Sequence, residues 1–188
     1  MPSASNTALL VIDVQRDILE IPDSPRKRET DKALDETVGR IARLISRARA
    51  VSVPVIYVQH DGEAGHRLET NTPGWQLRPE ITPATGEPVI HKRACDAFFQ
   101  TTLETELAER GIRRLVIAGC MTQYCVDTTV RRAVSLGFDV ILVADGHMTA
   151  DAGGFRFEQI IAHHNALLDG FDAGEHAVSV VQSSEIRL

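Results

Sequence analysis

The chain has 188 residues, 43% of them hydrophobic and 24% charged, which is typical of a single globular domain, residues 1–188, with a substantial core. Its formal net charge is −6, its longest basic run is 26-RKR-28 and its aromatic content is 5%, so nucleic-acid binding is not expected. No apolar run is long enough to cross a bilayer, and three cysteines do not suggest a disulfide framework, so we expect a cytoplasmic protein with free thiols.

Strand-like and helical segments alternate along the chain. The apolar run 8–14 predicts a strand buried on both faces, and apolar residues at helical spacing predict a helix over 30–50. The segments that follow in chain order are a strand at 54–59, a loop at 61–87, a strand at 88–92, a helix at 100–110, a strand at 114–119, a helix at 123–136, a strand at 139–144, a helix at 154–169 and a strand at 177–182.

This alternation predicts an α/β fold with right-handed crossovers and a parallel sheet covered on both faces. Ligands bind such sheets beyond the carboxyl ends of the strands, where the strand order reverses. Asp13 lies near the end of the first predicted strand, Lys92 ends the third, and Cys125 comes just after the fourth. We therefore expect these three residues at the same edge of the sheet.

Cys125 has a structural and a chemical interpretation. Free cysteines are among the most buried residues, so a packing role is the ordinary expectation. With Thr122 as the N-cap, however, Cys125 would be the third residue of a helix, where the helix dipole lowers the pKa of a thiol. The other two cysteines are predicted to pack at a strand end (Cys120) and to lie outside the site (Cys95).

Asp13 and Lys92 complement each other. Alone, Asp13 could be a turn residue and Lys92 a surface lysine. Burial among the apolar residues of 9-LLVID-13 would raise the pKa of the Asp13 carboxyl and suit it to carry a proton, provided that a cation compensates its charge. Lys92 can supply that cation, and Asp13 can then act as the base that activates Cys125.

Three motifs together carry a family resemblance: VIDVQ in the first strand, a lysine after the third, and GCMTQYCV before a helix. With them the chain resembles the isochorismatase-like cysteine hydrolases, which include nicotinamidases and N-carbamoylsarcosine amidase, over about residues 8–182. The resemblance implies a three-layer α/β/α sandwich around a mainly parallel six-stranded sheet. It also implies a homo-oligomer, a dimer or a tetramer.

The resemblance also implies roles for individual residues. Asp13, Lys92 and Cys125 match the catalytic triad, and the Met121–Thr122 bond matches a non-proline cis peptide. The backbone N–H groups of Met121 and Cys125 match the oxyanion hole. The implied reaction is hydrolysis of a small amide, ureido or related C–N bond through a thioester on Cys125.

Departures from the family pattern narrow the range of activities that we expect. Nicotinamidases bind a metal through an Asp-x-His pair and a further histidine, whereas 57-YVQHDGEAGH-66 offers His60 and His66 without that spacing. We therefore expect no metal and no cofactor. The isochorismatases that cleave a vinyl ether lack the nucleophilic cysteine, so Cys125 argues against that activity.

The substrate is expected to be a small molecule held by side chains around the triad. The residues predicted to line the pocket are Gln59, His60, Trp75, Phe98 and Tyr124. The loop at 61–87 is long enough to act as a lid. Two alternatives remain open: a binding protein that keeps this fold without turnover, and a thiol redox sensor that uses Cys120 and Cys125.

Overall fold

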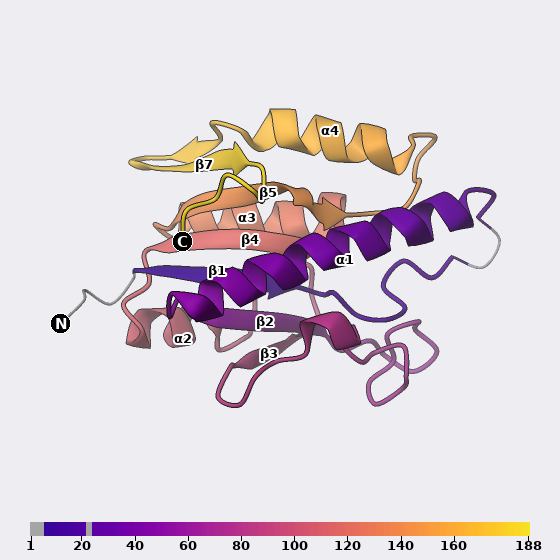
Figure 1. Cartoon of the computed structure of the whole chain (residues 1–188), viewed down its shortest axis with the longest axis horizontal. Coiled ribbons are helices and arrows are strands. Elements are labelled where there is room, and N and C mark those ends of the chain that lie inside the picture. The colour runs from indigo at the N-terminus through magenta and orange to yellow at the C-terminus, as the bar shows by residue number, and fades with distance from the viewer. Residues whose placement is uncertain (1–5, 22–23) are drawn as a thin grey trace.

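The computed structural model describes residues 6–21 and 24–188, so residues 1–5 and 22–23 of the predicted 1–188 domain lie outside the described part. The described chain forms an α/β sandwich, as predicted (Figure 1). Its strands are β1 (Thr7–Ile12), β2 (Val55–His60), β3 (Val89–Lys92), β4 (Arg114–Cys120), β5 (Asp139–Met148), β6 (Asp172–Ala173) and β7 (His176–Val181). Its helices are α1 (Lys27–Ala50), α2 (Leu103–Glu109), α3 (Asp127–Ser135) and α4 (Phe157–Leu168).

The sheet has the strand order β3-β2-β1-β4-β5-β7-β6, and only the β6–β7 pair is antiparallel. Six strands were expected, and the seventh is the two-residue edge strand β6, which is too short to produce a hydrophobic pattern. The strand order reverses between β1 and β4, because the chain moves from β1 to β2 on one side and from β4 to β5 on the other. This switch point is where a doubly wound sheet binds its ligand.

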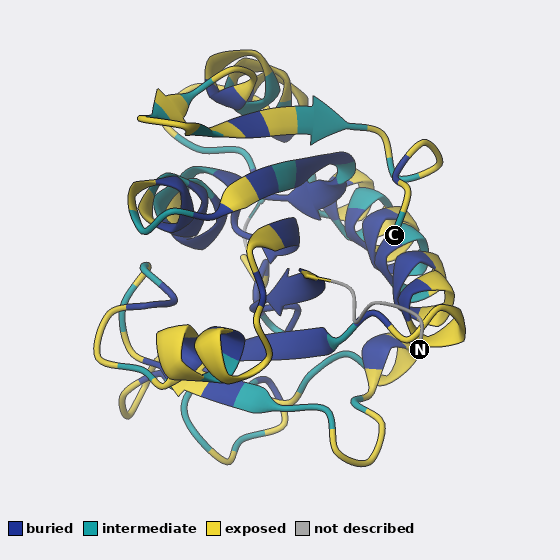
Figure 2. Cartoon of the chain, turned by 90° about the vertical axis from the view of Figure 1, so that its left-hand side faces the viewer, coloured by how far each residue is buried: buried dark blue, intermediate teal, exposed yellow. Residues whose placement is uncertain are grey.

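Two hydrophobic cores cover the two faces of the sheet. Alternate residues of β1 divide between them, since Leu9 and Val11 pack with α1 while Leu10 and Ile12 pack on the side of α2 and α3. Every residue of β1 is therefore buried, which explains its continuous apolar sequence. In Figure 2 the central strands are largely buried, and the helices that cover them carry both buried and exposed residues. No helix of the described chain is both long and apolar enough to span a membrane.

Several element boundaries differ from those predicted. β5 continues to Met148 instead of ending at 144, and α4 begins at Phe157 instead of 154. The helix predicted at 123–136 is two elements, a π-helical turn η2 (Thr122–Val126) followed by α3. The loop predicted at 61–87 contains a single 3-10 turn, η1 (Pro79–Ile81). Local sequence gives no signal for the π turn, because its geometry depends on how β4 ends.

Gly119 brings β1 and β4 together at the switch point. It pairs with Ile12 across the two strands at a φ of 133°, a backbone conformation that favours glycine. A Cβ atom at this position would lie 2.0 Å from the Ile12 carbonyl oxygen. The absence of a side chain at Gly119 therefore lets the strand ends that carry the candidate site lie side by side.

We expect Gly119→Ala to lower the free energy of unfolding by at least about 2 kcal/mol, because it adds both backbone strain and a clash with β1. Urea unfolding at neutral pH measures the effect. Gly39→Ala is the matched control: Gly39 lies within α1 and has room for a methyl group, so this change should be neutral or stabilising. Equal unfolding midpoints for the two variants would contradict the steric argument.

Candidate active site

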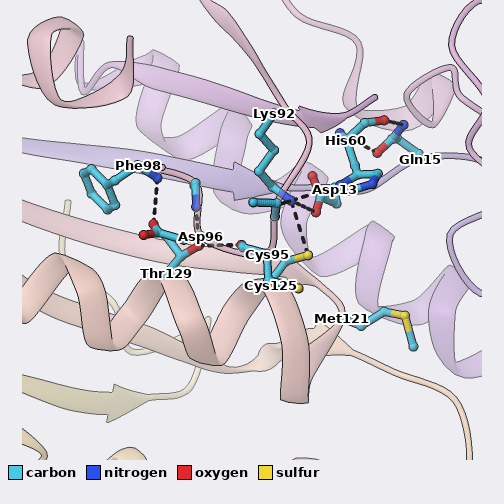
Figure 3. Close-up of polar contacts among 12 residues, drawn as sticks. Asp13, Gln15, His60, Lys92, Cys95, Asp96, Phe98, Met121, Cys125 and Thr129 are labelled. Carbon is cyan, nitrogen blue, oxygen red and sulfur yellow. Dashed lines mark hydrogen bonds and ion pairs between the residues drawn. The ribbon is translucent and has the colours of Figure 1, made fainter. Parts of the chain in front are cut away.

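The structure brings Asp13, Lys92 and Cys125 together at the carboxyl edge of the sheet (Figure 3). Lys92 Nζ lies 2.6 Å from Asp13 Oδ2 and 3.2 Å from Cys125 Sγ. The side chains of Asp13 and Lys92 are both completely buried, and Cys125 is 8% exposed. A carboxylate, an ammonium group and a thiol therefore meet in a site almost free of solvent.

Four adjacent strands supply one group each to this cluster. Asp13 follows β1, His60 ends β2, Lys92 ends β3, and Cys125 lies on the turn after β4. Lys92 reaches across the end of β2, where its Nζ lies 3.5 Å from His60 Nδ1. Because these strands are parallel, residues far apart in the sequence lie side by side at one edge of the sheet.

Asp13 is placed by an unusual backbone conformation. Its φ is 49°, a left-handed value that aspartate tolerates better than most residues, and its N–H donates to the Val58 carbonyl. Beyond Lys92 and the Cys125 thiol, no group in the described residues hydrogen-bonds to its buried oxygens. Burial raises the pKa of the Asp13 carboxyl above its ordinary value, although the charge of Lys92 opposes this rise.

Lys92 uses its three N–H donors within the site. They are directed to Asp13, to the sulfur of Cys125 and to the Ala94 carbonyl, 2.9 Å away. Burial lowers the pKa of the ammonium group, but the carboxylate and the sulfur outweigh burial and raise it above its ordinary value. Lys92 is therefore a fixed positive charge beside both partners.

The predicted lowering of the Cys125 pKa is wrong. Burial raises the pKa of the thiol above its ordinary value, the charge of Asp13 raises it further, and Lys92 opposes both effects. Thr122 is not the N-cap, because the π turn η2 begins at Thr122 with Met121 as its N-cap, and Cys125 is the fourth residue of that turn. Cys125 is thus a protonated thiol at rest, and its attack on a substrate requires a base.

The turn after β4 also differs from the prediction in its cis peptide bond. The bond expected at Met121–Thr122 is instead Cys120–Met121. The bond therefore joins the last residue of β4 to Met121, one residue earlier in the chain than expected. Met121 is the N-cap residue of η2, and its carbonyl accepts hydrogen bonds from the N–H groups of Tyr124 and Val126.

The predicted pocket residues fall into different environments. His60 lies beside Lys92, and burial, together with nearby positive charge, lowers its pKa to about 4. Gln59 is buried and donates to the Trp75 carbonyl at 2.9 Å. The Trp75 indole donates to Asp61 and stacks on His91 at 5.7 Å. Gln59 thus anchors the loop that carries Trp75.

The two remaining aromatic residues lie apart from the triad contacts. Phe98 is buried and stacks on Phe138 at 5.9 Å, so its ring packs in the core, and its place in the pocket stays a prediction. Tyr124 is 49% exposed and lines a cavity of about 490 Å³ together with Phe155 and Ile160. Apolar character alone could not distinguish these two positions in the sequence.

Gln15 is a supporting residue that the sequence reasoning missed. It is completely buried, and its amide nitrogen donates to the carbonyls of His60 and Trp75 at 3.0 and 2.8 Å. Its amide oxygen accepts the His60 N–H. Gln15 therefore joins the ends of β1 and β2 to the 61–87 loop. The sequence signal for this role was a polar residue at the end of the largely apolar motif VIDVQ.

His147 is a second missed residue, and it supports the turn that carries Cys125. Its Nδ1 lies 2.9 Å from Thr122 Oγ1, and its Nε2 lies 2.9 Å from Asn165 Oδ1. Burial lowers the pKa of His147 to about 4, so the ring is neutral near pH 7. Sequence reasoning missed His147 because the strand predicted at 139–144 ends before it.

Metal binding was not expected, and the described residues contain no group of three or more His, Cys, Asp or Glu side chains arranged to hold an ion. His60 and His66 have ring centroids 5.7 Å apart. The His66 Nδ1 accepts the Leu68 N–H, so this nitrogen already has a partner.

The fold and this cluster define an α/β protein with a buried carboxylate, amine and thiol at its switch point. The chain matches the Isochorismatase domain over residues 7–169, and it belongs to the isochorismatase family. A solved structure of an isochorismatase from Pseudomonas putida KT2440 is similar with a TM-score of 0.84 at 32% identity, covering 97% of this chain and 90% of that one.

Two curated relatives have named activities. The chain is 36% identical over 149 residues to streptothricin hydrolase from Streptomyces noursei, which covers 77% of this chain but only 55% of that protein. It is 28% identical over 187 residues to ureidoacrylate amidohydrolase from Variovorax paradoxus, covering 83% and 73% respectively. The chain thus spans about half the length of streptothricin hydrolase, and the family includes hydrolases of amides.

We expect acid to destabilise the fold between about pH 6.5 and 4, because the unfolded chain protonates His147 and His60 in this range while the folded chain does not. The stability that the two neutral histidines contribute is full well above pH 6.5 and is lost as the pH falls toward 4. Each histidine contributes a slope of up to about 1.4 kcal/mol per pH unit.

His147→Gln should reduce that slope by the contribution of one histidine, measured by urea unfolding at several pH values. Thr122→Val is the matched control, since it removes the same hydrogen bond but keeps the titrating ring, and it should retain the wild-type slope. A His147→Gln slope equal to that of wild type would show that His147 is protonated in the fold.

Proposed function

We propose that this chain is a metal-independent cysteine hydrolase that cleaves a small amide, ureido or related C–N bond through a thioester on Cys125. The observation that carries the proposal is the buried contact of Lys92 with both Asp13 and Cys125. Two relatives, a streptothricin hydrolase and a ureidoacrylate amidohydrolase, support chemistry on amide-type bonds.

Acylation begins with proton transfer from the Cys125 thiol to Asp13. The raised pKa of the carboxyl suits it to accept this proton, and Lys92 stabilises the negative charge that then resides on sulfur. The sulfur attacks the carbonyl carbon and forms a C–S bond. The oxygen takes up the negative charge, and we assign its stabilisation to the N–H groups of Met121 and Cys125.

The carbonyl then re-forms and the C–N bond breaks. Asp13 returns its proton to the departing nitrogen, which leaves as ammonia or an amine. In the second half of the reaction Asp13 removes a proton from water, and the resulting hydroxide attacks the thioester carbon. The C–S bond breaks, the sulfur regains its proton from Asp13, and a carboxylic or carbamic acid is released.

Around the triad, His60, Gln59 and Trp75 are proposed to position the substrate from the β2 side and Tyr124 from the η2 side. A neutral His60 can accept or donate a hydrogen bond without adding charge. Gln59 and Gln15 fix the Trp75 backbone and would hold this side of the pocket in place. Closure of the 61–87 loop as a lid stays a prediction.

The redox alternative is less well supported. Cys120 is completely buried, and burial raises the pKa of its thiol to about 12, which disfavours the thiolate needed for disulfide exchange. Cys95, Cys120 and Cys125 are all free thiols. A binding protein without turnover would have no evident use for a thiol whose base and counter-charge are buried beside it.

Two further expectations accompany the proposal. We propose a homo-oligomer, and the exposed aromatic rings of Tyr124 and Phe155 offer an apolar surface for such contact. A cytoplasmic location also stays a prediction; one relative, 29% identical, is a secreted isochorismatase effector from Verticillium dahliae.

We expect Cys125→Ala to lower turnover of amide or ureido substrates by at least about 10³-fold, because the covalent intermediate can no longer form. Intact-protein mass spectrometry should detect an acyl adduct on the wild type only. Cys95→Ala removes an exposed thiol and should keep full activity. Unchanged turnover in Cys125→Ala would rule out the thioester mechanism, and reversible loss of activity with a chelator would rule out metal independence.

We expect Asp13→Asn to slow alkylation of Cys125 by iodoacetamide at neutral pH by at least about 10-fold, because the amide cannot accept the thiol proton. Peptide mass spectrometry measures the rate, with exposed Cys95 in the same sample as the reference. Circular dichroism checks that the variant remains folded, since Lys92 loses its counter-charge. An unchanged rate at Cys125 in folded protein would remove Asp13 from the role of base.

A further inference from the structure

Arg67 is an arginine beside the candidate site with no acidic partner. Its Nη2 lies 3.4 Å from the sulfur of Met121, and the described residues place no carboxylate within ion-pair distance of its guanidinium. Other arginines of the fold, such as Arg26, Arg49 and Arg78, do form close pairs with carboxylates. A thioether is a weak acceptor, so the Arg67 side chain has no strong hydrogen-bond partner among the described residues.

The position of Arg67 connects it to the reacting groups. Met121 is the N-cap of the turn that carries Cys125, and its N–H is one of the two assigned to the oxyanion hole. The charge of Arg67 also contributes to lowering the pKa of His60, whose ring lies 3.5 Å from Lys92 Nζ. The guanidinium therefore lies near both the Met121 side and the His60 side of the site.

The backbone around Arg67 is held firmly while its side chain is exposed. The next residue, Leu68, is buried, its N–H donates to His66 Nδ1, and its carbonyl accepts the Gly62 N–H at 2.9 Å. Gly74 packs so closely that a Cβ there would lie 2.7 Å from the Arg67 carbonyl oxygen. The loop thus presents an exposed, charged side chain from a backbone held by these contacts.

The local charge balance favours an anionic ligand. Within the site, the carboxylate of Asp13 is matched by the ammonium group of Lys92. Asp61, the acidic residue beside His60, is engaged by the Trp75 indole and by His91, so Arg67 has no carboxylate of its own among the described residues, and His60 is neutral. A substrate carboxylate would compensate this charge and could accept two parallel hydrogen bonds from the guanidinium.

We propose that Arg67 binds a carboxylate of the substrate, so that the enzyme acts on small amide or ureido compounds that also carry a carboxylate group. This inference rests on the proposed function, since Arg67 is given the role of holding one end of a molecule whose carbonyl lies at Cys125. On binding, the guanidinium exchanges its contact with Met121 sulfur for the carboxylate oxygens.

Two alkylating reagents test this without knowledge of the natural substrate. Iodoacetate carries a carboxylate and iodoacetamide does not. With either, the Cys125 sulfur displaces iodide from the methylene carbon: one S–C bond forms, one C–I bond breaks, and the thiol proton passes to Asp13. The measured quantity is the rate ratio of iodoacetate to iodoacetamide at Cys125, with exposed Cys95 as the internal reference.

We expect the ratio at Cys125 to exceed that at Cys95 in the wild type and to fall about 10-fold or more in Arg67→Gln, because hydrogen bonds to charged groups are lost. Arg67→Lys keeps the charge without the planar fork and should give an intermediate ratio. Arg93→Gln is the matched control: it removes an exposed arginine next to Lys92 and should keep the wild-type ratio. An unchanged ratio in Arg67→Gln, or an equal fall in Arg93→Gln, would overturn the assignment to Arg67.

A binding measurement tests the role of Arg67 independently of whether Cys125 is the nucleophile. Calorimetry compares succinamate, which has an amide and a carboxylate, with succinamide, which has two amides, on Cys125→Ala and on Cys125→Ala/Arg67→Gln. We expect succinamate to bind Cys125→Ala at least about 10-fold more tightly than succinamide, and the second substitution to remove this preference. If Cys125 reacts with neither alkylating reagent, the nucleophile is wrong, and this measurement still decides the role of Arg67. Equal binding of the two compounds to Cys125→Ala would overturn it.

Discussion

The buried ion pair between Asp13 and Lys92 is the interaction on which the rest of the site depends. Moving two charges out of water costs several kcal/mol per ion, and only close geometry with further hydrogen bonds can offset that cost. The contact of 2.6 Å between two completely buried side chains meets the first condition. The Ala94 carbonyl and the Cys125 sulfur meet the second, because they occupy the remaining donors of Lys92. The contact with the Cys125 thiol therefore helps to offset the cost of burying the ion pair.

This arrangement determines the resting state of the thiol. A nucleophilic cysteine activated by a helix dipole would be a thiolate before substrate arrives. Here burial and the carboxylate of Asp13 keep Cys125 protonated, and burial also raises the pKa of Asp13. Both groups therefore hold a proton more tightly than they would in water, while Lys92 remains a cation beside them.

The parallel sheet explains why so much of the site could be predicted. Once strands and helices alternate, Asp13, Lys92 and Cys125 must share an edge, because parallel strands all end there. The features that failed depend on contacts between distant segments. The neutral state of His147, for example, follows from burial against Thr122 and Asn165. The stacking of Phe98 on Phe138 is likewise a contact that the sequence does not reveal.

Two separate hydrogen-bond networks hold the segments around the ion pair in place. Gln15 ties the ends of β1 and β2 to the Trp75 segment, and His147 ties the η2 turn to α4 through Asn165. One network therefore fixes the side of the site that holds Asp13 and His60, and the other fixes the side that holds Cys125. The two sides are joined by the contact of Lys92 with Cys125 and by the pairing of β1 with β4. Gly119 lies at that pairing, where a Cβ would clash with Ile12, so a side chain there would alter the distance between Asp13 and Cys125.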